Sequence, residues 1–226
     1  MDEILNGGIR VGSLRILNAP SISGRELITQ KFFYEGLSLE EGGTYVTTKN
    51  FTEDVIESMG ERGWNLNNYG NRYVFVDPYS IQSDPTLKDT ENIKYVSAIS
   101  DFAKLSNTIV SSMGDFLNKG IYQQRLSFDS IDTLLMYVSA NGVYRFLSYL
   151  RAKIKAFKSA GMFLLESGLH EEKAVKTILQ IADVLIDLSP NKSEISVTTP
   201  GGFKNDNSNT SDETICKEIN MYIGER

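Results

Sequence analysis

Short apolar segments alternate with longer amphipathic segments along most of the chain, and this alternation limits the fold more than any other feature of the sequence. The short segments are rich in β-branched and aromatic residues and are bounded by Gly, Asn, Asp or Ser, as buried strands are. Alternation of strands and helices builds a mostly parallel, twisted sheet with helices on both faces, so the predicted fold class is α/β. We predict strands over residues 14–17, 44–47, 73–76, 126–128, 162–165 and 184–188.

The longer segments carry apolar residues at steps of three and four, which is the spacing of an amphipathic helix. The longest of them, with Val96, Ile99, Phe102 and Ile109 on one face, predicts a helix over residues 95–117. Ligands of parallel sheets bind beyond the carboxyl ends of the strands, so a site is expected in the turns that follow the predicted strands. The other predicted helices cover residues 27–37, 51–59, 143–157 and 171–181.

The C-terminal part differs in composition from the rest. Residues 201–211 are rich in Gly, Asn, Ser and Asp, which is typical of a solvated loop, and residues 194–198 fit an edge strand before it. A chain of 226 residues supports one good-sized core. We therefore expect a core domain over residues 1–190 and a C-terminal extension over residues 191–226, with the polar loop and an edge strand or helix.

Composition excludes several classes of site. With one cysteine, Cys216, and one histidine, His170, neither a disulfide framework nor a Cys- or two-His zinc motif can form. The net charge of −6 disfavours nucleic acid as a partner. No apolar run reaches the roughly 20 residues of a membrane helix, and Met1-Asp2-Glu3 lacks the basic start of a signal peptide. We expect a soluble, cytoplasmic protein.

Several short motifs follow one another in a fixed order. MDEILNGGIRVGS at residues 1–13 precedes a strand, the turn at residues 19–26 precedes a helix with FFYEG, and YVTTKN, GWNL and FDS follow at residues 45–50, 63–66 and 128–130. This series resembles the KaiC-like and RAD55-like members of the RecA superfamily of P-loop ATPases, of the archaeal type. The resemblance covers residues 1–188 and implies a RecA-like P-loop fold.

The resemblance also identifies the turn at residues 19–26 as the Walker A motif, in a degenerate form. Ala19 and Ile22 stand where the family has phosphate-binding glycines, Arg25 stands at the lysine position, and Glu26 at that of the Mg²⁺-binding hydroxyl. A carboxylate at that position repels phosphate. The candidate nucleotide-binding residues, in this degenerate form, are Ala19, Pro20, Ser21, Ile22, Ser23, Gly24, Arg25 and Glu26.

Two further positions depart from the family pattern and one is kept. Lys49 and Asn50 occupy the positions of the two glutamates that activate the attacking water, and neither is a carboxylate base, so we expect no catalytic residue there. Asp129 is kept at the Walker B position. It is the candidate metal ligand, or alternatively a residue that hydrogen-bonds the neighbouring turn.

The altered turn and two other groups have alternative interpretations. Ser23-Gly24-Arg25-Glu26 fits a capping box, which we favour over an anion site formed by Arg25 and the helix N-terminus. Glu166, Ser167 and His170 lie where RecA-type proteins sense the γ-phosphate, and for His170 we favour a helix-start or interface role. A basic cluster is either a solvated helix end or a contact surface for an acidic partner or nucleic acid; it comprises Arg151, Lys153, Lys155 and Lys158.

Three functions fit these observations. The first is a non-catalytic regulatory or scaffold protein, a pseudo-ATPase of signal transduction that acts through a protein partner or self-association as an oligomer, without a cofactor. The second is an ATP-binding protein or slow ATPase that uses Mg·ATP. The third is a DNA-binding recombination accessory protein. We expect neither nucleic acid nor a membrane as a partner.

Overall fold

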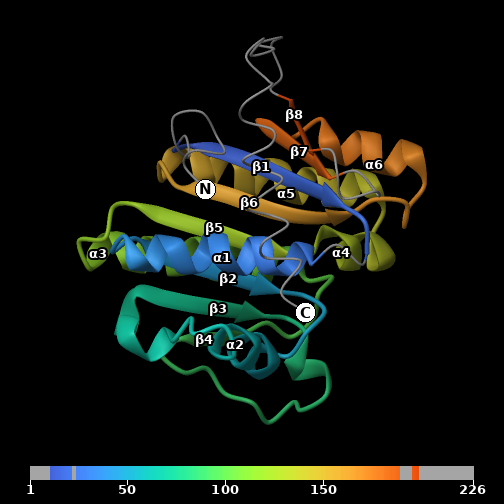
Figure 1. Ribbon diagram of the computed structural model, residues 1–226. Helices are drawn as coiled ribbons and strands as arrows, with labels where there is room; N and C mark the ends of the chain where they lie inside the picture. Colours follow the sequence, from blue (N-terminus) through green and yellow to red (C-terminus); the bar gives the residue numbers. More distant parts are fainter. Residues whose placement is uncertain (1–10, 22–23, 189–194, 199–226) are drawn as a thin grey trace.

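The computed structural model describes residues 11–21, 24–188 and 195–198, which form one twisted sheet with helices on both faces (Figure 1). The strand order is β4-β3-β2-β5-β6-β1-β7-β8. Strands β1 to β7 pair in parallel, and β8 pairs antiparallel with β7 at the edge. The strands are β1 (Ser13–Ala19), β2 (Gly42–Thr47), β3 (Tyr73–Asp77), β4 (Ile93–Tyr95), β5 (Gln124–Asp129), β6 (Ala160–Glu166), β7 (Val184–Leu188) and β8 (Ile195–Thr198).

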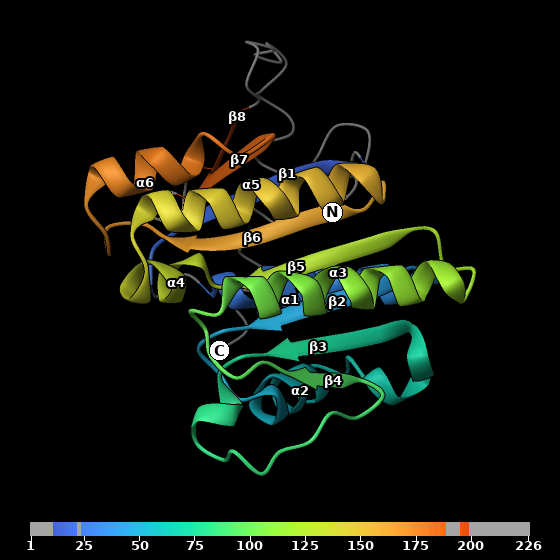
Figure 2. The ribbon, with the colours of Figure 1, turned by 180° about the vertical axis from the view of Figure 1, so that it is seen from behind.

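The helices divide between the two faces, as the alternation in the sequence predicts. The two helices nearest the N-terminus, α1 (Arg25–Ser38) and α2 (Thr52–Gly60), lie in front of the sheet in Figure 1. The view from behind shows the other four described helices on the opposite face (Figure 2). The predicted α/β class is confirmed, with the layered arrangement of a RecA-like P-loop fold. The helices are α1 (Arg25–Ser38), α2 (Thr52–Gly60), α3 (Phe102–Asn118), α4 (Ile131–Tyr137), α5 (Ala140–Ala156) and α6 (Glu172–Leu179), with short 3₁₀ turns η1 (Leu66–Arg72) and η2 (Ser80–Gln82).

Neighbouring residues of a strand face opposite layers of the core, since successive side chains of a strand alternate. Ile16 of β1 packs in the cluster formed with α3, α5 and α6, whereas Leu17 packs with Ile28 and Phe32 of α1. Both faces of the sheet are therefore covered by apolar side chains of the helices, as is usual for a parallel sheet.

The register of the sheet aligns the carboxyl ends of four strands at one edge. Ala19 of β1 lies beside Glu166 of β6, and Thr47 of β2 lies beside Asp129 of β5. Because β5 pairs with both β2 and β6, the turns after β1, β2, β5 and β6 are brought together. These are the turns in which the sequence places the candidate site.

One predicted helix is wrong at its start, and one helix was not predicted. Residues 95–117 were expected to be helical throughout, but residues 93–95 form strand β4 and α3 begins at Phe102. Asp101 sets that start, because its carboxylate accepts the Lys104 amide at 2.9 Å. Val96 and Ile99 are buried from the loop before α3, which mimics helical spacing. Helix α4, seven residues long, has no counterpart in the prediction.

The other predicted elements are present with small shifts at their ends. The edge strand predicted over residues 194–198 is present as β8. Trp64 is buried against the sheet and stacks on Tyr34, with ring centroids 5.9 Å apart. Within the described part of the chain, no helix combines the length and the apolar character that crossing a membrane requires.

Candidate functional site

The turn after β1 carries the residues that the sequence predicts to be a degenerate Walker A motif. Ala19 ends the strand and Pro20 and Ser21 follow, while Ile22 and Ser23 lie outside the described residues. Gly24 adopts the left-handed conformation with φ 68°, which favours glycine. It is the N-cap residue of α1 and offers no side chain to the helix start.

The predicted capping box requires the N-cap one residue earlier, at Ser23, so that Glu26 is the third residue of the helix. With Gly24 as the N-cap, Glu26 is instead the second residue, and its carboxylate turns to other partners. The predicted hydrogen bond of the Ser23 side chain lies outside the described residues. The N-cap at Gly24 is one residue later than the capping box requires, so the prediction of a capping box is wrong in its register.

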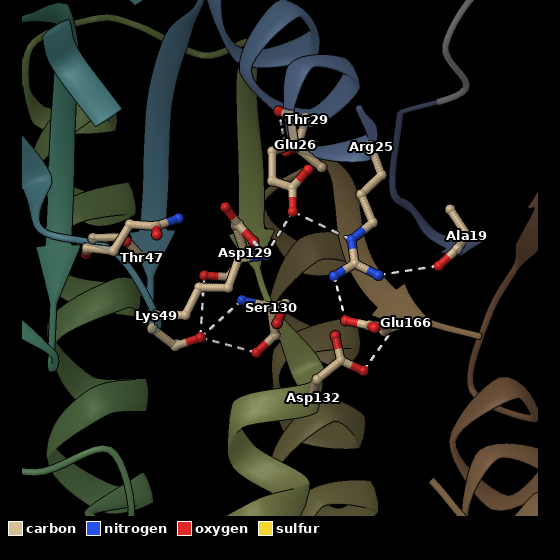
Figure 3. Close-up of polar contacts among 12 residues, drawn as sticks. Ala19, Arg25, Glu26, Thr29, Thr47, Lys49, Asp129, Ser130, Asp132 and Glu166 are labelled. Carbon is tan, nitrogen blue, oxygen red and sulfur yellow. Dashed lines mark hydrogen bonds and ion pairs between the residues drawn. The ribbon is translucent and has the colours of Figure 1, made fainter. Parts of the chain in front are cut away.

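Arg25 closes the turn onto the neighbouring strand β6 (Figure 3). Its guanidinium is buried, with 2% of the residue exposed. It donates from Nη1 to the carbonyl oxygen of Ala19 at 3.1 Å and from Nη2 to the carboxylate of Glu166. The amide of Ser167 donates to the same Ala19 oxygen at 3.0 Å. The beginning of α1, the end of β1 and the end of β6 are thus held together by one side chain.

The electrostatics of this pair favour both charges. Burial opposes ionisation of Arg25 and Glu166, but their mutual hydrogen bond and the neighbouring charges together outweigh it. The pKa of Glu166 is therefore lowered and the pKa of Arg25 is raised from their ordinary values. The Arg25 Nε also lies 3.3 Å from Glu26 Oε1, so all three groups on the guanidinium face acceptors within the protein.

Lys49, from the turn after β2, forms the second half of the network. Its Nζ donates to Glu26 Oε1 at 2.7 Å and lies 3.7 Å from Asp129 Oδ1 (Figure 3). Burial opposes ionisation of Glu26, but the hydrogen bond and charge of Lys49 lower the pKa of this carboxyl. Glu26 and Lys49, which the sequence resemblance assigns to the Mg²⁺-hydroxyl position and to a catalytic glutamate position, therefore neutralise each other.

Asp129 ends β5 and is 0% exposed. Its Oδ2 accepts from the Tyr45 hydroxyl at 3.2 Å, whereas Oδ1 has no hydrogen-bond partner among the described residues. Burial is the main cause that raises the pKa of Asp129 to about 6. The adjoining turn is held by backbone and hydroxyl contacts of Thr48, whose amide donates to the Asp129 carbonyl at 2.7 Å and whose Oγ1 accepts from the Ser130 amide at 2.8 Å.

Of the predicted γ-phosphate sensor residues, Glu166 and Ser167 contact the Walker A turn, and His170 lies behind them. The carboxylate of Asp132, from α4, accepts the Glu166 amide at 2.8 Å and lies 3.6 Å from His170 Nε2. The carbonyl oxygen of Asn50 accepts from the Thr47 hydroxyl at 2.7 Å. The structure thus brings these positions to one edge of the sheet.

Three residues of the site escaped the sequence interpretation: Tyr45, Thr48 and Asp132. Tyr45 and Thr48 lie within the YVTTKN motif beside the positions that were singled out, so that motif was a usable signal. Asp132 follows Asp129 by three residues on the helix that was not predicted. The contacts of all three depend on the pairing of β2, β5 and β6.

The basic cluster of α5 lies at the opposite end of the sheet, because α5 leads into the amino end of β6. Arg151 pairs with Asp183, donating from Nε to its two carboxylate oxygens at 3.2 and 3.1 Å. The Lys153 ammonium lies 5.1 Å from the ring centre of Tyr149. Two of the four basic residues therefore have intramolecular partners.

The described residues of this turn do not fit a magnesium–nucleotide complex bound in the P-loop manner. That mode needs a cation free to contact phosphates and a hydroxyl on the metal. Here Arg25 is committed to Glu166 and Ala19, and Glu26 is committed to Lys49. Among the described residues, no three His, Cys, Asp or Glu side chains form a group that could hold a metal ion.

Comparison with known proteins gives one family and several distant relatives. The family described as "ATPase: KaiC" matches residues 1–199. A UPF0273 protein of Pyrococcus furiosus is 28% identical over 137 residues, which are 59% of this chain and 52% of that protein. A UPF0273 protein of Thermotoga maritima is 24% identical over 182 residues, 76% of this chain and 69% of its own length. The circadian clock oscillator protein KaiC of Nostoc is 26% identical over 151 residues, 64% of this chain and 26% of its own length. The chain thus spans about half the length of the Pyrococcus relative.

Proposed function

The chain belongs to the KaiC family of ATPases, and from this premise we propose that it is a non-catalytic member: a regulatory or scaffold protein that acts through protein–protein contacts and does not hydrolyse ATP. The observation that carries the proposal is the contact of Lys49 Nζ with Glu26 Oε1 at 2.7 Å. This contact joins residues 26 and 49. An ATPase of this type has a neutral hydroxyl residue at the first position and a glutamate at the second, whereas this chain has a glutamate and a lysine.

Phosphate binding is disfavoured by the groups that surround Arg25. A phosphate would have to displace Glu166 and the Ala19 carbonyl from the guanidinium, with loss of a buried ion pair. It would also meet the carboxylate of Glu26, and two like charges 4 Å apart repel by about 4 kcal/mol at an effective dielectric of about 20. The Arg25 guanidinium therefore stabilises the fold through contacts within the protein and is not free to bind phosphate.

Activation of an attacking water is disfavoured as well. A general base needs a carboxylate or another group that accepts a proton near neutral pH. Lys49 is a hydrogen-bond donor to Glu26, and Asn50 uses its carbonyl oxygen for the Thr47 hydroxyl. Asp129 is fully buried and faces Tyr45 and Lys49. The contacts of Lys49, Asn50 and Asp129 together support the proposal of a non-catalytic protein.

A role in signalling through protein partners is supported by one relative and one surface. The Nostoc relative is a circadian clock oscillator protein by name. In this chain, Met136 and Tyr137 of α4 and Leu169 of the turn after β6 are exposed at the carboxyl edge of the sheet, to 64%, 60% and 44%. We propose that a protein partner or a second copy binds this protein in the cytoplasm.

Phosphate release from Mg·ATP tests the proposal. We expect no release above the buffer rate from the wild-type chain, and the same background from the Asp129→Asn variant. Release by the wild type that disappears in Asp129→Asn would reject the non-catalytic function, because that loss would assign the turnover to this site.

Family membership supports a second candidate, an ATP-binding protein or slow ATPase in which Arg25 at the start of α1 contacts phosphate. Calorimetric titration with Mg·ATP separates the two candidates. Heat of binding that is reduced in Arg25→Lys would support this one. No heat from either protein at high concentration would reject it.

A further inference from the structure

Two carboxylates from different elements face one ammonium group at the carboxyl edge of the sheet. Glu26 comes from the first turn of α1 and Asp129 from the end of β5. The Lys49 Nζ lies 2.7 Å from Glu26 Oε1 and 3.7 Å from Asp129 Oδ1. Figure 3 shows the Lys49 side chain extending between these groups. The ammonium thus bridges two acidic groups that are far apart in the sequence.

Asp129 is the less satisfied of the two carboxylates. It is 0% exposed, and its Oδ1 has no hydrogen-bond partner among the described residues although it is directed toward Lys49. An ionised carboxylate buried in this way needs a nearby positive charge. Among the described residues, Lys49 is the group that forms an ion pair with it. The distance of 3.7 Å is longer than a hydrogen bond, so the two groups interact chiefly through their charges.

We infer that the Lys49 ammonium is a built-in cation, which takes the place of a divalent metal ion between Glu26 and Asp129, and that removal of this one charge turns the two carboxylates into a divalent-cation site. Carboxylate oxygens are the ligands that Mg²⁺, Mn²⁺ and Ca²⁺ prefer. The inference rests on the proposed function, because it states how the chain supplies without metal the charge that its acidic residues require.

The same contact explains why the wild-type chain excludes such an ion. A divalent cation close enough to bind both carboxylates would lie next to the ammonium, and the repulsion between them acts across a partly buried space. The Lys49 side chain is 27% exposed and Glu26 is 28% exposed, so solvent screens this repulsion only in part. Water and ions can reach the position from outside once the lysine is shortened or neutralised.

Binding of Mn²⁺ alone, without nucleotide, tests the inference on the full chain. Free Mn²⁺ is counted by electron paramagnetic resonance during titration of the wild type, Lys49→Met and the charge-keeping control Lys49→Arg. We expect Lys49→Met to bind Mn²⁺ at least about tenfold more tightly than the other two proteins, because the repelling charge is gone. The double variant Lys49→Met, Asp129→Asn should lose the gain.

Two outcomes would overturn the inference: equal Mn²⁺ affinity of the wild type and folded Lys49→Met, or a gain that survives in the double variant. Near-UV circular dichroism reports folding, and Lys49→Gln serves as a second uncharged variant. If both uncharged variants unfold, recovery of the native spectrum on addition of Mn²⁺ supports the inference, and failure to recover contradicts it. Because no nucleotide is present, the result is independent of ATP turnover, which tests the proposed function separately.

Discussion

Arg25 and Glu166 form a largely buried ion pair that joins the first residue of α1 to the last residue of β6, although 141 residues separate them in the sequence. The pair fastens the turn after β1 to the middle of the sheet. In a P-loop protein this turn has to remain open around phosphates. The same position here is filled by contacts within the protein, and the predictions that follow depend on those contacts.

Loss of the Arg25 guanidinium should destabilise the fold. In Arg25→Met, the carboxylate of Glu166 and the Ala19 carbonyl lose their donor, and breaking a buried ion pair from one side costs about 3 kcal/mol or more. Arg151→Met is the matched control, since Arg151 also pairs with a carboxylate but its side chain is 47% exposed. That change should cost at most about 1 kcal/mol. Urea unfolding of both variants measures the difference, and equal losses would contradict a structural role of the Arg25 pair.

Restoring a glutamate at position 49 alone should harm the protein. Lys49→Glu places a third carboxylate beside Glu26 and Asp129 and should lower the free energy of unfolding by about 3 kcal/mol. Addition of Glu26→Thr removes one of the repelling charges and should recover roughly half of that loss. The two changes together are thus less harmful than Lys49→Glu alone. Additive effects in urea unfolding would show that residues 26 and 49 do not interact.

Asp129 should make stability fall as pH rises through the range from about 4 to about 6. Its pKa is raised from 3.8 to about 6, chiefly by burial, so the folded state holds this proton more tightly than the unfolded state. By linkage, the contribution is most favourable below 3.8, decreases up to about 6 and is constant above it.

Asp129→Asn removes this contribution. The interval from pH 4.5 to the pKa of about 6 spans about 1.5 pH units, which corresponds to about 2 kcal/mol, so the stability of Asp129→Asn relative to the wild type should be higher at pH 7 than at pH 4.5 by about that amount. Urea unfolding of both proteins across this range measures the difference. A difference that does not change with pH would show that the Asp129 pKa is not raised.

The Thr48 hydroxyl should be worth more than an ordinary surface hydrogen bond. Its Oγ1 accepts from the Ser130 amide at 2.8 Å and contacts the Asp129 and Ser130 carbonyls at 3.1 and 3.0 Å, in a fully buried place. Thr48→Val leaves a buried amide unpaired, at a cost of about 1 to 3 kcal/mol. Thr108→Val is the control, because the hydrogen bond from the Thr108 hydroxyl to the Lys104 carbonyl is exposed to solvent. Similar losses in thermal unfolding would contradict the account.

The layers of the fold could be predicted from the sequence because each central strand is a short apolar run between polar or glycine residues. The failures have local causes. Val96 and Ile99 are buried although they lie in the loop before α3, and their spacing resembles that of a helix. Helix α4 has seven residues, which are too few to show a helical repeat of apolar positions. Helices and strands could thus be predicted where the spacing of the apolar residues in the sequence matched the face that is buried in the structure.

The site could be predicted only in part. Its residues lie in short sequence motifs that can be recognised, but its contacts join residues that are far apart in the sequence. The order of motifs located Arg25, Glu26, Lys49 and Asp129, but their pairing depends on β1 lying next to β6 and β2 next to β5. Sequence spacing carries no information about Glu166 as the partner of Arg25. The expected capping box fails for a different reason, because Gly24 takes the N-cap position in the left-handed conformation.

The central claim is that the chain does not hydrolyse ATP, and single-turnover hydrolysis tests it most directly. With the protein in large excess over radiolabelled Mg·ATP, even a slow or weakly bound reaction reaches the detection limit. The account predicts the same rate of phosphate release from the wild type, Asp129→Asn and buffer alone. A wild-type rate above buffer that Asp129→Asn abolishes would contradict it.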